Sequence, residues 1–119
     1  MARILIAEDE TGLRVAMAGW LAASGHRVIA CEDGEKAWQE LGSMAPERPD
    51  VLVLDVQMPR LGGIAFLARC DAAGQPIPCI LVTGRPDLPE LLALAQSGRA
   101  RVLAKPFSLK ELSAAVAPA

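Results

Sequence analysis

Carboxylate side chains follow two short apolar runs of this chain, at places where strands of a sheet would end. Glu8 and Asp9 come directly after RILIA, and Asp55 closes the run VLVLD. A continuous apolar run bounded by turn residues is typical of a strand covered on both faces, as in a parallel sheet. Because ligands of open α/β sheets bind outside the carboxyl ends of the strands, these carboxylates are candidate functional residues.

Two further polar residues stand at the ends of later apolar runs. Thr83 follows CILV, and Lys105 follows RVLA. Carboxylates held close together repel one another, and Mg²⁺ relieves the repulsion by accepting oxygen ligands while it keeps several waters. A lysine ammonium and a threonine hydroxyl can both meet a phosphoryl oxygen. Together these residue types indicate a carboxylate nucleophile, a metal, a cation and a hydrogen-bond donor arranged for phosphoryl transfer.

The elements that would position these residues alternate regularly between strand and helix patterns. Gly25 is suited to close the first helix, and Ser108 with Glu111 forms a capping-box pattern that opens the last one. Asp87 with Glu90 predicts a similar box, with Asp87 as the N-cap of the fourth helix. This alternation predicts an α/β fold with a doubly wound, five-stranded parallel sheet and five helices. The predicted strands cover residues 3–7, 27–31, 51–55, 79–82 and 101–104, and a helix follows each.

Composition indicates a single domain over residues 1–119. Hydrophobic residues make up 52% and charged residues 22%, which excludes a disordered chain. A net charge of -2 gives no sign of a nucleic-acid surface, and no apolar run approaches the roughly 20 residues that span a bilayer. Acidic residues from position 8 argue against a signal peptide, so we expect a cytoplasmic protein with reduced, buried cysteines. The same composition is compatible with an output domain that follows Ala119 in the natural protein.

In their order along the chain, these motifs resemble the receiver domains of response regulators in two-component signalling, which are CheY-like. The resemblance covers essentially the whole chain. It implies the strand order 2-1-3-4-5 and the three-layer sandwich of flavodoxin-like folds. It also implies a signalling switch that catalyses its own phosphorylation and dephosphorylation, rather than an enzyme. The matching residues are Glu8-Asp9, Asp55-Val56-Gln57-Met58-Pro59 with Gly63, Thr83-Gly84 and Lys105-Pro106-Phe107.

The resemblance further implies roles for individual residues. Asp55 would accept a phosphoryl group, and Glu8, Asp9 and Asp55 would hold Mg²⁺ together with the backbone carbonyl of Gln57. The donor would be a sensor histidine kinase or a histidine phosphotransfer protein. The downstream target or effector domain stays unidentified, and a homodimer formed on phosphorylation is a further candidate partner. Neither direct nucleic-acid binding nor membrane attachment is implied.

The residues around the phosphoryl group follow the family pattern only in part. By resemblance, Thr83 and Lys105 would contact the phosphoryl oxygens, and Lys105-Pro106 would be a cis peptide. Gly84 and Val102 fall in the region that switches. Val102 stands where the family usually has Tyr or Phe, which puts the usual aromatic movement in doubt. A second departure is Gly62, where the family often has an acidic residue, although glycine suits a helix N-cap.

Two alternative functions are a binding module and a phosphohydrolase. A receiver-like binding module that works without phosphorylation would not need the intact site residues. A phosphohydrolase with an Asp nucleophile would commonly carry a second Asp two positions later as the general acid, but Gln57 stands there and cannot donate as an acid does. Elsewhere, we expect His26 on the surface, and Trp20 and Trp38 as core or partly exposed fillers on apolar helix faces.

Overall fold

The computed structural model of the chain describes residues 1–117. All strands that it contains form one parallel sheet in the order β2-β1-β3-β4-β5, so the predicted order is confirmed. Strands and helices alternate without interruption, as the sequence pattern indicates. The elements are β1 (Arg3–Ala7), α1 (Thr11–Ala23), β2 (Arg27–Cys31), α2 (Gly34–Ser43), β3 (Val51–Asp55), α3 (Gly63–Ala72), β4 (Cys79–Thr83), α4 (Pro89–Gln96), β5 (Ala100–Ala104) and α5 (Leu109–Val116).

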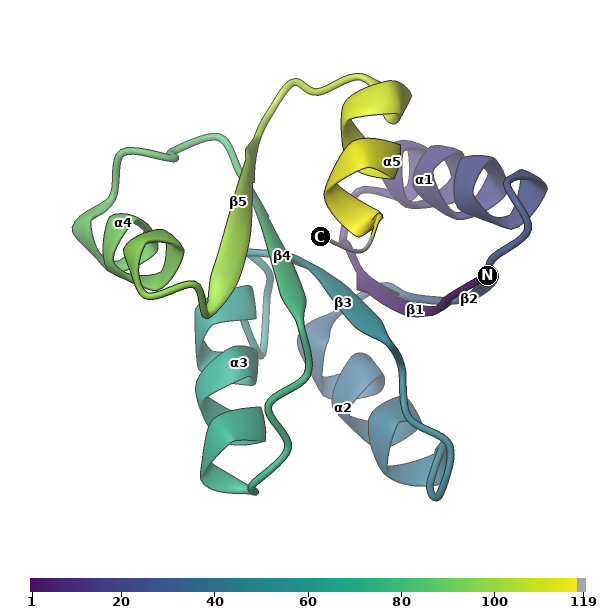
Figure 1. Cartoon of the computed structure of the whole chain (residues 1–119), viewed down its shortest axis with the longest axis horizontal. Coiled ribbons are helices and arrows are strands. Elements are labelled where there is room, and N and C mark those ends of the chain that lie inside the picture. The colour runs from purple at the N-terminus through teal and green to yellow at the C-terminus, as the bar shows by residue number, and fades with distance from the viewer. Residues whose placement is uncertain (118–119) are drawn as a thin grey trace.

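Helices cover both faces of the sheet, which gives three layers (Figure 1). Helices α1 and α5 lie side by side on one face, and α2, α3 and α4 cover the other. Alternate residues of each strand supply the two cores, since successive side chains point to opposite faces. In β1, for example, Ile4 and Ile6 pack toward α1 and α5, whereas Leu5 and Ala7 pack toward the other layer.

Every residue of β3 and of β4 is buried. This burial explains why the sequence shows continuous apolar runs there, because a central strand of a parallel sheet has no solvent-facing side. The edge strands β2 and β5 contain exposed residues as well. Asp55 at the end of β3 and Thr83 at the end of β4 are therefore held by the best-packed part of the sheet.

Most predicted helix ends agree with the structure. Helix α1 ends at Ala23, just before Gly25, whose φ of 95° needs a glycine. The capping box of α5 is formed, since Ser108 accepts the amide of Glu111 while the Glu111 carboxylate accepts the amide of Ser108. Helix α3 has Gly62 as its N-cap.

The capping box predicted at Asp87 and Glu90 is wrong. Leu88 is the N-cap of α4, it makes no side-chain cap bond, and Pro89 is the first helical residue. Proline pushes the residue before it toward extended backbone, which moves the helix start one position along the chain. The carboxylate of Asp87 instead accepts a hydrogen bond from Arg85.

One other expectation needs adjustment. His26 is half-buried rather than on the surface, and its Nδ1 accepts the amide of Ala2 at 3.0 Å. The two tryptophans agree with expectation: Trp38 packs edge-on against Phe66, and Trp20 is partly exposed, at 37%, with its indole donating to Ser113. The three cysteines are buried and free, as expected. Within residues 1–117, the helices are all too short or too polar to cross a bilayer.

Candidate functional site

The polar residues that follow the apolar runs meet at the carboxyl edge of the sheet. Asp55 is the last residue of β3, and Thr83 is the last residue of β4. Glu8 follows β1 directly, and Lys105 follows β5 directly. Because the four strands are parallel and adjacent, positions up to 97 residues apart in the sequence (8 to 105) end beside one another. The sheet topology alone accounts for this clustering.

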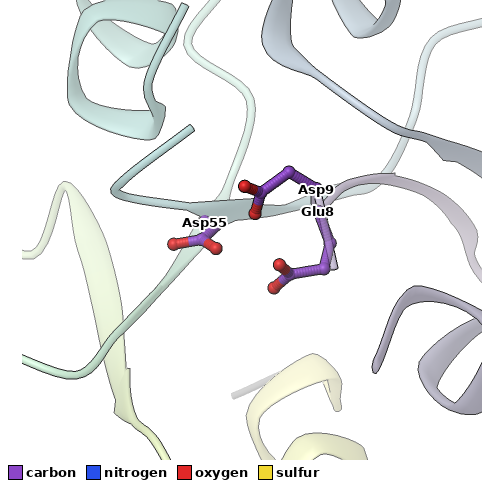
Figure 2. Close-up of side chains that lie close together, drawn as sticks. All are labelled: Glu8, Asp9 and Asp55. Carbon is purple, nitrogen blue, oxygen red and sulfur yellow. The ribbon is translucent and has the colours of Figure 1, made fainter. Parts of the chain in front are cut away.

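Three carboxylates form the centre of the site (Figure 2). One oxygen each from Glu8, Asp9 and Asp55 lies within 4.8 Å of the others. Glu8 is 1% exposed and Asp55 is 5% exposed, whereas Asp9 is open to solvent. Two buried acids and one exposed acid therefore share a small space that can be reached from outside.

Lys105 contributes the positive charge of the site. Its Nζ donates to Asp55 Oδ2 at 2.9 Å and lies 3.2 Å from Glu8 Oε1. Burial lowers the pKa of this ammonium, but the hydrogen bond and charge of Asp55, with the charge of Glu8, raise it overall. Lys105 therefore stays charged beside the two buried carboxylates. The Lys105–Pro106 peptide bond is cis.

Glu8 is the site carboxyl that burial affects most clearly. Burial raises its pKa from 4.5 to about 7, and the neighbouring carboxyl of Asp55 adds to the effect. Its Oε2 accepts the amide of Glu10 at 3.1 Å. Its Oε1 is buried and, among residues 1–117, finds no hydrogen-bond donor, because the nearby Lys105 ammonium is not aligned for a hydrogen bond.

These features fit a hard divalent cation. A cation such as Mg²⁺ takes carboxylate oxygens as ligands, and the unsatisfied oxygen of Glu8 lies in the cluster with Asp9 and Asp55. It would also offset the repulsion among the three acids. The donor set consists of oxygen atoms alone, which suits Mg²⁺ rather than a metal that prefers nitrogen or sulfur. These three residues could therefore hold a metal.

The other expected site residues lie around this centre. Thr83 is 2% exposed, and its Oγ1 accepts the amide of Arg85 at 2.9 Å rather than bonding to Asp55. The amide of Gln57 donates to Asp55 Oδ1 at 3.0 Å. Gly84 is exposed, whereas Val102 is half-buried in β5 and packs against the core below α4.

Arg14 belongs to the surroundings of the site but was not expected from the sequence. Its guanidinium donates to the backbone carbonyl of Glu8 at 2.9 Å, and it also donates to Thr11. A side chain of helix α1 thereby fixes the backbone of Glu8, where the acidic pair begins. Arg14 is the one charged residue in the sequence TGLRVAMAGWLAA of α1, and this isolation was a signal that could have marked it.

A second unexpected contact joins α2 to the loop after β3. Asp33 is the N-cap of α2, and its Oδ1 accepts the amide of Lys36 at 2.8 Å. Its Oδ2 accepts a hydrogen bond of 2.6 Å from the guanidinium of Arg60. Nothing in the sequence pairs Asp33 with Arg60.

Comparison with known proteins gives a consistent result. A model described as "Response regulator receiver domain" matches residues 4–117. The response regulator MprA of Mycobacterium avium strain 104 is 37% identical over 112 residues, which cover 94% of this chain and 48% of that protein. The chain thus spans about half the length of the curated relatives it matches.

Solved receiver domains share the fold as well. The non-phosphorylated HemR receiver domain from Leptospira biflexa has a TM-score of 0.85 at 26% identity, over 98% of this chain and 91% of that one. The chemotaxis protein CheY4 of Vibrio cholerae has a TM-score of 0.78 at 27% identity, over 98% and 99%. Sequence and architecture therefore lead to the same group of proteins, and this chain belongs to the response regulator receiver domains of two-component systems.

Proposed function

We propose that this receiver accepts a phosphoryl group on Asp55 in a Mg²⁺-dependent reaction and signals through the resulting conformational change. One observation carries the proposal: the Asp55 carboxylate lies beside both the Lys105 ammonium and the acidic pair Glu8-Asp9. A carboxylate in that position has a cation to meet an incoming phosphoryl oxygen and neighbouring acids to hold a metal.

The chemistry assigned to Asp55 is nucleophilic. One of its carboxylate oxygens attacks the phosphorus of a phosphohistidine, the phosphorus–nitrogen bond breaks, and the leaving imidazole keeps the electron pair and takes up a proton. The Lys105 ammonium is 2.9 Å from Asp55 Oδ2, so it is close enough to pair with an oxygen of the phosphoryl group once that group is bound to Asp55. Thr83 would donate its hydroxyl to one of these oxygens, since its Oγ1 is at present only an acceptor, from Arg85.

The metal ligands that we propose are the carboxylates of Glu8, Asp9 and Asp55 with the backbone carbonyl of Gln57. When bound, Mg²⁺ would neutralise the acidic cluster and the charge of the transferred group. The buried, unsatisfied Oε1 of Glu8 supports this assignment. The amide of Gln57 already donates to Asp55, so the start of this loop is ordered beside the acceptor.

The partner that this chemistry requires is a protein carrying a phosphohistidine. We propose a sensor histidine kinase or a histidine phosphotransfer protein, in the cytoplasm. Residues 1–119 would form one receiver domain. Because the curated relatives are about twice as long as the part that matches, we propose that an effector region reads the switch.

The metal dependence can be tested with Asp9→Ala. Asp9 is the exposed member of the cluster, so its loss should leave the fold intact while it removes a ligand. We expect Mg²⁺ affinity to fall by about tenfold or more, since even residues that only orient a metal ligand are commonly worth that much. Isothermal titration calorimetry measures the affinity, and a phosphate-affinity gel after incubation with acetyl phosphate measures phosphorylation, which should fall in parallel.

Glu10→Ala is the matched control. Glu10 is an exposed acid next to the cluster but not part of it, and its side chain makes no cap bond to α1. Its variant should bind Mg²⁺ nearly as the unaltered protein does. Equal affinities for the Asp9→Ala variant and the unaltered protein would show that the acidic cluster does not hold the metal.

A further inference from the structure

The loop between β3 and α3, residues 56–62, is fastened to the start of α2 by one ion pair. Asp33 is only 2% exposed, whereas the side chain of Arg60 is 66% exposed and reaches over to it from 27 residues along the chain. Surface ion pairs usually contribute little to stability. This pair differs because one partner is buried, so the loss of Arg60 would leave Asp33 Oδ2 without its donor.

The backbone of Arg60 shows that the loop is held under constraint. Its φ is 71°, in the left-handed region, and it is the one residue other than glycine with a positive φ in the described part of the chain. Such a conformation persists where the surroundings hold it in place. Next to it, Leu61 packs so closely on α2 that a methyl group at Gly34 would overlap the carbonyl oxygen of Leu61. The loop is thus seated on the first turn of α2.

The same loop leads directly into the phosphorylation site. It begins after Asp55, and the amide of Gln57 donates to that acceptor. Its other end is equally tight, because a side chain at Gly62 would meet the carbonyl of Val56, and one at Gly63 would meet the carbonyl of Asp55. Both ends are packed against the acceptor strand and Leu61 is packed on α2, and the ion pair of Arg60 adds a polar contact at the middle of the loop.

We propose that Asp33 and Arg60 form a latch that positions the loop for metal binding. They are positioning residues, because neither belongs to the acidic cluster. The inference rests on the proposed function, in which Gln57, three residues before Arg60, offers its carbonyl to Mg²⁺. The latch keeps this stretch seated before the metal arrives, so that binding does not first have to order the loop.

The test uses two variants that keep the local fold. Arg60→Asn removes the guanidinium but tolerates the left-handed backbone, and Asp33→Asn keeps an oxygen for the Lys36 amide while it removes the charge. Each should weaken Mg²⁺ binding by about tenfold, as loss of a residue that orients a ligand does. The double variant should bind no more weakly than either single one, because both changes break one contact.

Two measurements separate positioning from general stability. Calorimetry gives the Mg²⁺ affinity, and amide hydrogen exchange without metal should be faster over residues 56–62 in both variants. Arg60→Lys, which keeps a positive charge, should recover part of the affinity. Glu35→Gln is the control, because it removes a carboxylate from the same turn of α2 and breaks an exposed ion pair with Arg69 of α3, at 3.5 Å, that does not involve the loop. It should leave both readouts unchanged.

The outcomes distinguish the latch from the proposed function. If the unaltered protein binds no Mg²⁺, the proposed function and this inference both fall. If Asp9→Ala loses Mg²⁺ while Arg60→Asn and Asp33→Asn bind it as the unaltered protein does, only the latch is wrong. Should Arg60→Asn fail to fold, Asp33→Asn and Arg60→Lys still decide between these results.

Discussion

Glu8 is the site residue whose protonation should respond most to pH near neutrality. Burial raises its pKa from 4.5 to about 7 in the folded, metal-free protein. Between these values the folded chain keeps a proton that the unfolded chain has released, so the metal-free fold loses stability as pH rises through this window. Mg²⁺ binds the deprotonated carboxylate, so its apparent affinity should rise over the same window, by up to about tenfold per pH unit, and level off above about pH 7.

Calorimetric titrations with Mg²⁺ across this range test the role of Glu8. Glu8→Gln cannot titrate at this position, so the variant should bind Mg²⁺ more weakly and should lose the rise in affinity below pH 7. If the variant and the unaltered protein show the same dependence of Mg²⁺ affinity on pH, another group causes this dependence, and the proton on Glu8 does not compete with the metal.

Single residues differ in how far they could be predicted from the sequence. Glu8, Asp55 and Lys105 each follow a continuous apolar run, and parallel strands bring such positions to one edge, so their proximity could be expected. The pair of Asp33 and Arg60 could not, because it depends on how a loop folds back onto a helix. A left-handed backbone at an arginine has no sequence signal of its own, since glycine or asparagine usually marks that conformation.

At the level of elements, β5 is where this receiver departs from the pattern it resembles. Val102 stands where the family usually has an aromatic residue, and it pairs with Leu81 of β4 while packing against the core under α4. Valine is stiff at χ1 and has no ring that could swing inward. We therefore expect phosphorylation to move Thr83 and the loop 84–87, while β5 changes little. The output surface would then be the start of α4, with the half-buried Leu88 as a candidate contact. Leu91 was a second candidate from the sequence, but it is fully buried and cannot contact a partner there.

Amide NMR shifts with and without beryllofluoride, which mimics the phosphoryl group, test this expectation. Shifts should be large at Thr83 and over the loop 84–87, and small at Val102 and Leu103. Val102→Phe supplies the missing ring, so this variant should show larger shifts in β5. Shifts at Val102 equal to those at Thr83 in the unaltered protein would show that the absent ring does not limit the response.

Element boundaries could be predicted wherever a local signal acts alone. Ser108 and Glu111 form the expected box, and no proline stands between them. At α4 the signals conflict: Asp87 pairs with Arg85, and Pro89 moves the helix start past it. Local patterns therefore predicted each element, and competition between neighbouring residues decided where this helix begins.

For the whole molecule, continuous apolar runs and their alternation with helix patterns were enough to predict a doubly wound parallel sheet. The order of the strands could not be predicted in this way, because no local pattern encodes which strands are neighbours. The order was predicted from the resemblance to the family, and the structure confirms it. The order matters for function, since β1 and β3 are adjacent and β4 and β5 follow. It brings two acids, the acceptor, a hydroxyl and an ammonium to one edge.

The most direct test of this account is the mass of the protein after reaction with acetyl phosphate and Mg²⁺. It should increase by one phosphoryl group, held as an acyl phosphate that is stable in acid and labile in base. Asp50→Asn, just before the other end of the same strand, should still be phosphorylated, because the Asp50 carboxylate accepts the amide of Arg3 at the end of the sheet away from the site. Asp55→Asn should abolish the gain in mass. An undiminished gain in the Asp55→Asn variant would contradict the assignment of Asp55 as the acceptor.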